Sequence, residues 1–376
     1  MAQRDDEILS LLLETPDRPF SIADIQAEVQ AERTTLYRRL TGLVEQRLVI
    51  AEGEGKWRRY RINPDSDAFL VWDLNLPPSA RKVVPYNPRL LDDYVPNETF
   101  MLTQEQRARM QQATRLDKLG TVTGADYRRI LDSLIIDLSY ASSNLENVKI
   151  SWLDTKTLFE FGQKPEGLSE KELKIVLNHK DAIRFMIDNK LAFDRRDLMD
   201  LHAILTNGLF AEEAVSGRIR TKVVVIDGSQ YRPLNNPFLL DEELDRIIEK
   251  AHAIEDPFEE SIFALAFLSY LQPFQDGNKR TARLASNLPL LNHRLPPFSF
   301  SDIKGKDYNL GMLAFYERGR ADFIAKAFHD AYLKTAPRYA DLVGLVGGGA
   351  MLDTLSLDEL RDAHAAPQAP LRRPKP

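Results

Sequence analysis

The stretch SYLQPFQDGNKRTAR, from Ser269 to Arg283, decides how this chain is interpreted. The segment before it, ESIFALAFLSYL, is apolar nearly all round, which predicts a central buried helix. Pro273 and Gly277 end that helix, and NKRTARLASNLPLLN begins another. A Gly-Asn pair at a helix N-terminus presents backbone N–H groups and the positive end of the helix dipole. The stretch therefore predicts an anion site.

Charged side chains in the same stretch indicate which anion. Lys279, Arg280 and Arg283 place cations on the new helix, and Asp276 stands beside them. A carboxylate together with substrate phosphates is the usual ligand set of Mg²⁺. Together these residues predict a nucleoside polyphosphate bound through its phosphates with Mg²⁺. The alternative is a capped helix with a solvated basic first turn.

The full stretch resembles the signature of the Fic (Fido) family, H-x-F-x-(D/E)-G-N-(G/K)-R-x-x-R. It matches at Phe274, Asp276, Gly277, Asn278, Lys279, Arg280 and Arg283. The resemblance implies a mainly α-helical core with a β-hairpin flap. It also implies protein adenylyltransferase activity (AMPylation), in which AMP passes from ATP to a protein hydroxyl. Asp276 would then hold Mg²⁺, and the other matching residues would bind the nucleotide.

A second motif extends the resemblance. SSNLEN, at residues 142–147, is similar to the Fic motif SSxxE(G/N). In that family the motif's glutamate lies on an inhibitory helix and pairs with the last arginine of the signature. The resemblance therefore makes Ser142, Glu146 and Asn147 the inhibitory motif. Glu146 would pair with Arg283 and block the γ-phosphate.

The segment GRIRTKVVVIDGSQYRPL, at residues 217–234, predicts the flap. Val223–Ile226 is expected to form one strand, and Asp227-Gly228 its turn. In the Fic family this hairpin docks the target segment by strand addition. The resemblance covers residues 86 to about 333.

One position departs from the signature, because Gln272 stands where the family has its catalytic histidine. An amide cannot accept the proton of the attacking hydroxyl, and losing a general base typically costs ~10²–10⁴ in rate. His179, His202 and His252 lie on predicted helices, where a structural or solvated role is expected. His293 lies too far along its helix to replace the base. The chain is therefore a slow AMP transferase, a transferase with another donor, or a nucleotide-sensing protein without activity.

Residues 1–65 predict a separate domain. DDEILSLLLE, SIADIQAEV and ERTTLYRRLTGLVEQRLV have helical apolar spacing, and LVIAEGEGKWRRYRI alternates like a hairpin with its turn at Gly53–Gly55. Three helices followed by a hairpin resemble a winged helix-turn-helix domain, which places its third helix in the major groove of DNA. The residues expected to face DNA are Thr34, Thr35, Tyr37, Arg38 and Arg39 of the third helix and Lys56, Arg58, Arg59 and Arg61 of the hairpin. The alternative is a module for protein contacts.

The remaining organisation follows from composition. Residues 66–100 contain five prolines and predict a connector, residues 101–335 the Fic domain with its inhibitory helix, and residues 336–376 a partly disordered extension with a short helix at about 355–364. The 376 residues include no cysteine, which excludes disulfides and thiolate catalysis. The formal charge of −6 disfavours nucleic-acid binding by the chain as a whole. No long apolar run or signal-peptide pattern is present, so a cytoplasmic protein without membrane contact is expected.

Two functions compete at this point. One is a protein adenylyltransferase that binds ATP and Mg²⁺ and is autoinhibited by Glu146. The other is a DNA-binding transcriptional regulator whose inactive Fic domain senses a nucleotide. The sequence identifies neither the target protein nor the DNA site, and it leaves a homodimer open.

Overall fold

The structure, a computed structural model, describes residues 3–114, 124–211, 215–301 and 303–347. The chain divides into two compact units, Met1–Val84 with Ile226–Gln230, and Pro85–Val225 with Tyr231–Pro376. The helix expected at about 355–364 and the predicted tail lie outside the described residues.

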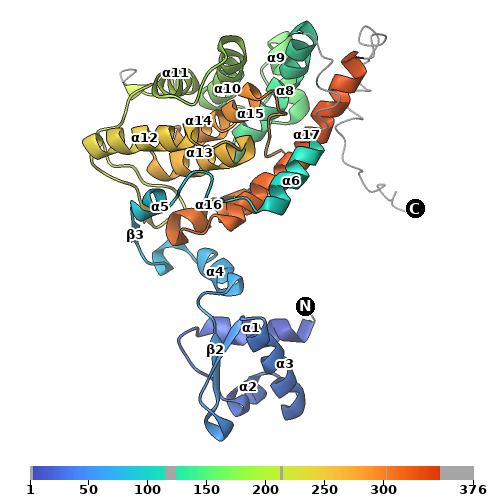
Figure 1. Ribbon diagram of the computed structural model, residues 1–376, viewed down its shortest axis with the longest axis vertical. Coiled ribbons are helices and arrows are strands. Elements are labelled where there is room, and N and C mark those ends of the chain that lie inside the picture. Colours follow the sequence, from blue (N-terminus) through green and yellow to red (C-terminus); the bar gives the residue numbers. More distant parts are fainter. Residues whose placement is uncertain (1–2, 115–123, 212–214, 302, 348–376) are drawn as a thin grey trace. The chain divides into compact units, whose positions relative to one another are not determined.

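The first unit contains three helices followed by an antiparallel pair of strands (Figure 1). Its elements are α1 (Gln3–Glu14), α2 (Ile22–Glu28), α3 (Arg33–Glu45), β1 (Val49–Glu52), η1 (Gly55–Trp57), β2 (Arg59–Ile62), α4 (Asp67–Leu74), η2 (Pro78–Ala80) and part of β3 (Val84–Pro85). Ser21 begins α2 with a capping box: its hydroxyl accepts from the N–H of Asp24, whose carboxylate accepts from the N–H of Ser21. The strand register pairs Val49 with Ile62.

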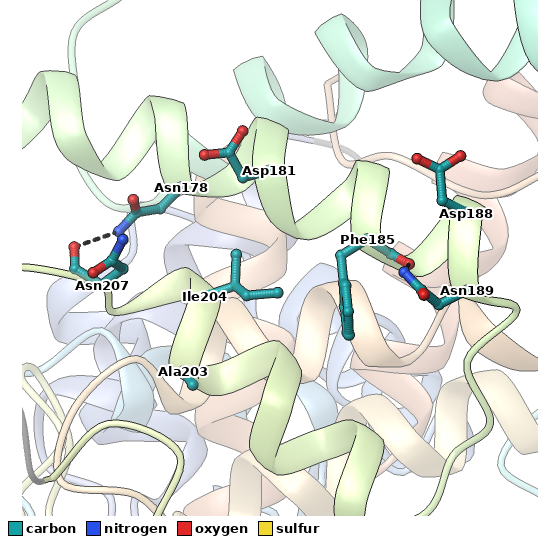
Figure 2. A pocket seen from close by; sticks show the side chains of 8 residues that line it. All are labelled: Asn178, Asp181, Phe185, Asp188, Asn189, Ala203, Ile204 and Asn207. Carbon is teal, nitrogen blue, oxygen red and sulfur yellow. Dashed lines mark hydrogen bonds between the residues drawn. The ribbon is translucent and has the colours of Figure 1, made fainter.

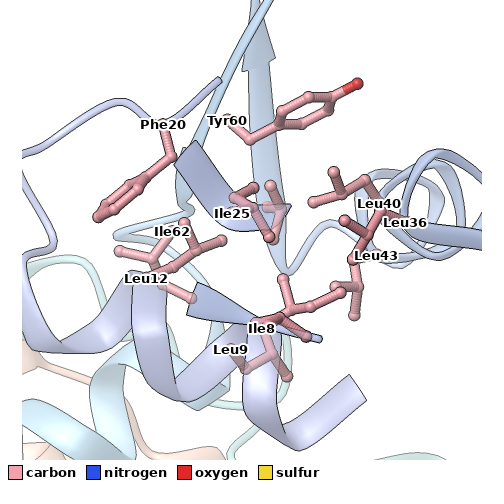
Figure 3. Close-up of a cluster of buried hydrophobic side chains, with 12 residues drawn as sticks. Ile8, Leu9, Leu12, Phe20, Ile25, Leu36, Leu40, Leu43, Tyr60 and Ile62 are labelled. Carbon is pink, nitrogen blue, oxygen red and sulfur yellow. The ribbon is translucent and has the colours of Figure 1, made fainter. Parts of the chain in front are cut away.

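An apolar core holds this unit together, as Figure 3 shows. Leu36, Leu40 and Leu43 recur every three or four residues along α3, so they share one buried face. Facing them are buried side chains from α1, α2 and the strands, among them Ile8, Leu12, Ile25, Tyr60 and Ile62. The predicted elements of residues 1–65 are therefore present and enclose one core.

The second unit is mainly helical (Figure 1). Its elements are α5 (Arg89–Asp92), α6 (Gln104–Ala113), α8 (Gly124–Leu145), α9 (Trp152–Phe161), α10 (Glu170–Asn189), α11 (Arg195–Leu205), β4 (Tyr231–Arg232), α12 (Pro237–His252), α13 (Pro257–Leu271), α14 (Asn278–Ala285), α15 (Leu288–Asn292), α16 (Gly305–Arg318) and α17 (Asp322–Gly347). Helix α13 is buried at every position from Ser261 to Leu271 and packs against α12, α14, α15 and α16. The prediction of a central buried helix is confirmed.

The predicted flap differs from the expected hairpin. Val223–Ile226 forms no strand, although the turn at Asp227-Gly228 is present, with Gly228 at φ +76°. The segment after the turn, Tyr231–Arg232, pairs instead with Val84–Pro85 of the connector. An isolated two-stranded hairpin is marginal in water, and here a strand distant in sequence supplies the pairing.

Two helix boundaries also differ from expectation. NKRTARLASNLPLLN forms two helices, α14 and α15, because Pro289 has no N–H to donate to the carbonyl of Ala285. Helix α17 continues through the expected domain boundary at Thr335 to Gly347, with Pro337 inside it. No helix in the described part of the chain is long and apolar enough to cross a membrane.

Candidate functional site

The loop between α13 and α14 has a preset shape. Asn278 closes it, since its Oδ1 accepts from the N–H of Phe274 at 2.8 Å and its Nδ2 donates to the Phe274 carbonyl at 2.7 Å. Gly277 begins α14 at φ +79°, and a Cβ there would lie 2.9 Å from Cγ2 of Thr206. Both the left-handed backbone and the close approach therefore require glycine.

His202 of α11 packs against this loop and hydrogen-bonds to it. Its ring stacks on Phe274, with the centroids 3.9 Å apart, and its Nε2–H donates to the Asp276 carbonyl at 2.9 Å. Its Nδ1 accepts from the N–H of Gly217 at 2.8 Å. Burial lowers the pKa of His202 to about 4. His202 is thus a neutral scaffold, and the fully buried Phe274, predicted to bind nucleotide, packs on that scaffold.

Gln272 occupies a left-handed corner at the end of α13, with φ 51° and ψ 58°. Its side-chain Nε2 donates to the Ser269 carbonyl at 2.6 Å, and the residue is 5% exposed. Its own carbonyl accepts from Nε of Arg220 at 2.7 Å. The amide therefore bonds back to its own helix, where the Fic signature has a base.

Arg220 was not singled out from the sequence, yet it joins this corner to the flap. Arg220 is 3% exposed, and its guanidinium donates to the carbonyls of Gln272, Lys222 and Leu234. Its backbone N–H donates to the Pro273 carbonyl at 2.9 Å. An arginine within GRIRTKVVV looks like any surface cation, so only its burial reveals this role.

The predicted inhibitory glutamate lies between two buried arginines. Glu146 Oε1 is 2.7 Å from Nη2 of Arg283, and Glu146 Oε2 is 3.5 Å from Nε of Arg280. Both arginine side chains are 3% exposed and Glu146 is 22% exposed. Burial raises the pKa of Glu146, but the two guanidinium groups outweigh it and hold that pKa below its ordinary value. The carboxylate therefore stays charged, pairs with both guanidinium groups and offsets one of their two positive charges.

The end of α8 explains how Glu146 reaches them. Asn147 adopts a left-handed φ of 64°, its N–H donates to the Asn144 carbonyl, and the N–H of Val148 donates to the Ser143 carbonyl. This is a Schellman motif, whose left-handed position favours glycine or asparagine. Asn147 thus turns the chain at the residue after Glu146.

Asp276 is the predicted Mg²⁺ ligand. Its side chain is 63% exposed, its Oδ1 accepts from the N–H of Gly277 at 2.6 Å, and its Oδ2 lies 3.3 Å from Nη2 of Arg280. Across the described ranges, no group of three or more histidine, aspartate or glutamate side chains could hold a metal ion. A single exposed carboxylate fits Mg²⁺ only when phosphate oxygens complete the coordination. Lys279 lies half-buried on the first turn of α14.

A cavity of about 570 Å³ lies elsewhere in this unit, lined by α10, α11 and the turn after α11 (Figure 2). Its lining residues are Asn178, Asp181, Phe185, Asp188, Asn189, Ala203, Ile204 and Asn207. None of the predicted site residues lines it.

The residues predicted to face DNA lie in the first unit. Thr34, Tyr37, Arg38 and Lys56 are exposed, and Thr35, Arg39, Arg58 and Arg59 are half-buried. Arg61 is engaged, with its Nε 2.8 Å from Oε1 of Glu52. Trp57, which the winged-helix pattern does not single out, is 69% exposed between Lys56 and Arg58.

Comparison with known proteins finds a family match within the helical unit. Residues 192–290 match the family model Fic/DOC. "Protein adenylyltransferase fic-1" of Caenorhabditis briggsae and its namesake in Caenorhabditis elegans are each 27% identical over 179 residues, which cover 45% of this chain and 34% of the relative. "Protein adenylyltransferase Fic" of Nematostella vectensis is 26% identical over 188 residues, covering 48% of this chain and 44% of that protein.

The chain thus matches about a third to just under half of the length of these relatives. Among solved structures, "Fic-1 (aa134 - 508) from C. elegans" has a TM-score of 0.54 at 22% sequence identity, covering 64% of this chain and 73% of that one. This likeness shows the fold. The family match, the relatives and the fold together establish that this chain contains a Fic domain.

Proposed function

We propose that the chain is a Fic-type protein adenylyltransferase, autoinhibited by Glu146 and slowed by Gln272. The observation that carries the proposal is the position of the Glu146 carboxylate between Arg280 and Arg283. Both arginines lie on α14, the helix that begins at the anion loop. Two buried cations need an anionic partner, and phosphate oxygens can replace a carboxylate in that role. The relatives' printed name, protein adenylyltransferase, supports ATP as the source of those phosphates.

The residues of the loop divide the work of binding. The N-terminus of α14, with Lys279, holds the phosphate chain. Asp276 would hold Mg²⁺ beside the phosphates, and the ion would offset part of their negative charge. Arg283, once released from Glu146, contacts the γ-phosphate and fixes the orientation of the triphosphate.

Gln272 determines the rate of the chemical step. A hydroxyl oxygen of the target attacks the α-phosphorus, the bond from that phosphorus to the pyrophosphate oxygen breaks, and the hydroxyl proton passes to solvent. Without a base, the step is slower by ~10²–10⁴ than with a histidine. Positioning and electrostatic stabilisation of the triphosphate supply the remaining catalysis.

The target segment would dock on the first limb of the flap. Val223–Val225 forms no strand and pairs with none of the described strands, and Val223 and Val225 are 65% and 69% exposed. A segment outside any strand ladder can become extended and accept an added strand, and the two valines can then contact alternate side chains of the target.

The test is transfer of label from α-labelled ATP, GTP, CTP or UTP. We expect Glu146→Gly to label itself or a target with AMP, and the parent to label less. Arg283→Ala in the same background is the control and should remove the gain. The proposal fails if calorimetry finds no binding of Mg·ATP to the Glu146→Gly protein.

A second function, DNA binding by a regulator, is favoured by the exposed cations of the first unit. Arg38 lies on the third helix and Lys56 at the tip of the hairpin, each exposed. This arrangement is the one expected of a winged helix-turn-helix domain. In this function the Fic domain senses a nucleotide without transferring it. Gln272 therefore does not have to accept a proton.

DNA binding should weaken with salt, and two sets of variants should change that salt dependence differently. Replacing Arg38 and Lys56 with alanine should flatten the plot of log affinity against log salt by about 0.9 unit for each lost phosphate contact. Arg61→Ala is the control, because that guanidinium is held by Glu52, and it should leave the slope nearly unchanged. Absence of retardation of any genomic fragment by the full chain at low salt would make this unit a module for protein contacts.

A further inference from the structure

A buried histidine lies behind the inhibitory motif. His179 of α10 is 0% exposed, with its Nδ1 2.8 Å from the Ile175 carbonyl and its Nε2 2.8 Å from Oγ of Ser142. A carbonyl oxygen only accepts, so Nδ1 carries the hydrogen and Nε2 has the lone pair. The hydroxyl of Ser142 must therefore donate to His179.

This donation fixes what Ser142 offers to its other neighbour. With its hydrogen directed at Nε2, the Ser142 oxygen presents lone pairs, and it accepts from Nε of Arg283 at 3.0 Å. The Ser142 carbonyl accepts from Nη2 of Arg283 at 3.3 Å. Ser142 thus holds two nitrogens of Arg283 independently of Glu146.

The polarity of this chain of hydrogen bonds depends on a neutral imidazole. Burial lowers the pKa of His179 to about 3, so the ring is neutral near pH 7. A protonated ring would have two donors and no acceptor. Ser142 would then lose the acceptor for its hydroxyl hydrogen, and that hydrogen would compete with Arg283 for the same space.

We propose that His179 is a positioning residue, which orients the hydroxyl of Ser142 so that Arg283 stays in place when Glu146 leaves it. The two hydrogen bonds that Arg283 donates to Ser142 then keep the guanidinium ordered, and less conformational freedom is lost when a phosphate replaces the carboxylate. The inference rests on the proposed function, because the phosphate contact of Arg283 is part of that function.

The first test measures the affinity of the full-length Glu146→Gly protein for Mg·ATP by calorimetry. Adding His179→Leu, which has no acceptor, should weaken binding about tenfold, equivalent to ~1.4 kcal/mol. Adding His179→Gln, which keeps an acceptor oxygen, should restore affinity to within about threefold. Adding Ser142→Ala should match His179→Leu, and the triple variant should be no weaker than either, because both changes break one pathway.

Two outcomes would overturn the proposal. One is equal affinity of His179→Leu and its background. The other is equal weakening by His179→Leu and His179→Gln, since that result would show a packing role for the ring. Thermal unfolding of each variant is recorded alongside, and a loss of affinity counts only for variants that stay folded at the assay temperature.

A second measurement separates this inference from the proposed function, because it needs no nucleotide. In ¹⁵N-labelled Glu146→Gly protein, the His179 ring should show the tautomer protonated at Nδ1, and the Nε–H signal of Arg283 should be protected from exchange. His179→Leu should remove that protection and His179→Gln should keep it. If the background does not bind ATP, the proposed function fails, and this measurement alone decides the role of His179.

Discussion

Gln272→His combined with Glu146→Gly should raise AMP transfer by about 10²–10⁴-fold over Glu146→Gly alone, measured as label from α-labelled ATP. The left-handed corner accepts the change, because histidine is enriched several-fold at such backbone angles. The new ring can donate through Nδ1–H to the Ser269 carbonyl, which the Gln272 amide now contacts. Its Nε2 then remains as the base, with an ordinary pKa near 6.5.

The matched control is Gln272→Asn, which also suits a left-handed backbone and keeps an amide. It should leave transfer at the level of its Glu146→Gly background. A double variant that binds ATP tightly yet labels nothing, itself included, would contradict the adenylyltransferase proposal. Such a result would favour a site adapted to nucleotide sensing.

Glu146→Gly should lower the free energy of unfolding by about 3 kcal/mol when no nucleotide is bound. The change removes the carboxylate that pairs with the buried Arg280 and Arg283, and breaking a buried ion pair typically costs ~3–5 kcal/mol. The lower end applies because Glu146 is 22% exposed. Mg·ATP at a hundred times its dissociation constant should restore about 2.7 kcal/mol, which chemical denaturation can measure.

Asn147→Gly is the control for this second result. It preserves Glu146, and glycine suits the left-handed position at least as well as asparagine, so stability should not fall. A loss of equal size in both variants would show that the turn, and not the charge, matters.

Acidity gives a further check on the same pair. The pKa of Glu146 in the folded protein lies below its ordinary value of 4.5, so the stability it contributes is present above that value and is lost as pH falls through the folded pKa. The stability gap between parent and Glu146→Gly should therefore narrow on acidification below about pH 4.5. A gap that stays constant to pH 3 would contradict the ion-pair explanation.

The sequence predicted best what depends on neighbouring residues. The burial of helix α13 was predicted from its all-round apolar pattern. The start of α14 was predicted from Gly277, which the left-handed backbone at that turn requires. The contact of Glu146 with Arg283 was expected only from the resemblance to the Fic family, because 137 residues separate the two along the chain.

What the sequence missed depends on packing between distant segments. His179 and Arg220 sit in ordinary helical and basic patterns, and only burial beside Ser142 and Gln272 gives them roles. The prediction of a flap hairpin was wrong for a related reason. Tyr231–Arg232 has strand character, but its partner comes from Val84–Pro85, which no local pattern connects to it.

The first limb of the flap also affects how the purified protein behaves at high concentration. Val223–Val225 is a run of three valines that forms no strand, and two of its side chains are largely exposed. Unpaired segments of this kind can add to one another edge to edge, which promotes self-association. Lys222 and Asp227, which flank residues 223–226, oppose a parallel, in-register stack, because each charge would lie beside its own copy. The same open backbone that suits an incoming target segment therefore needs its flanking charges to keep the chains apart.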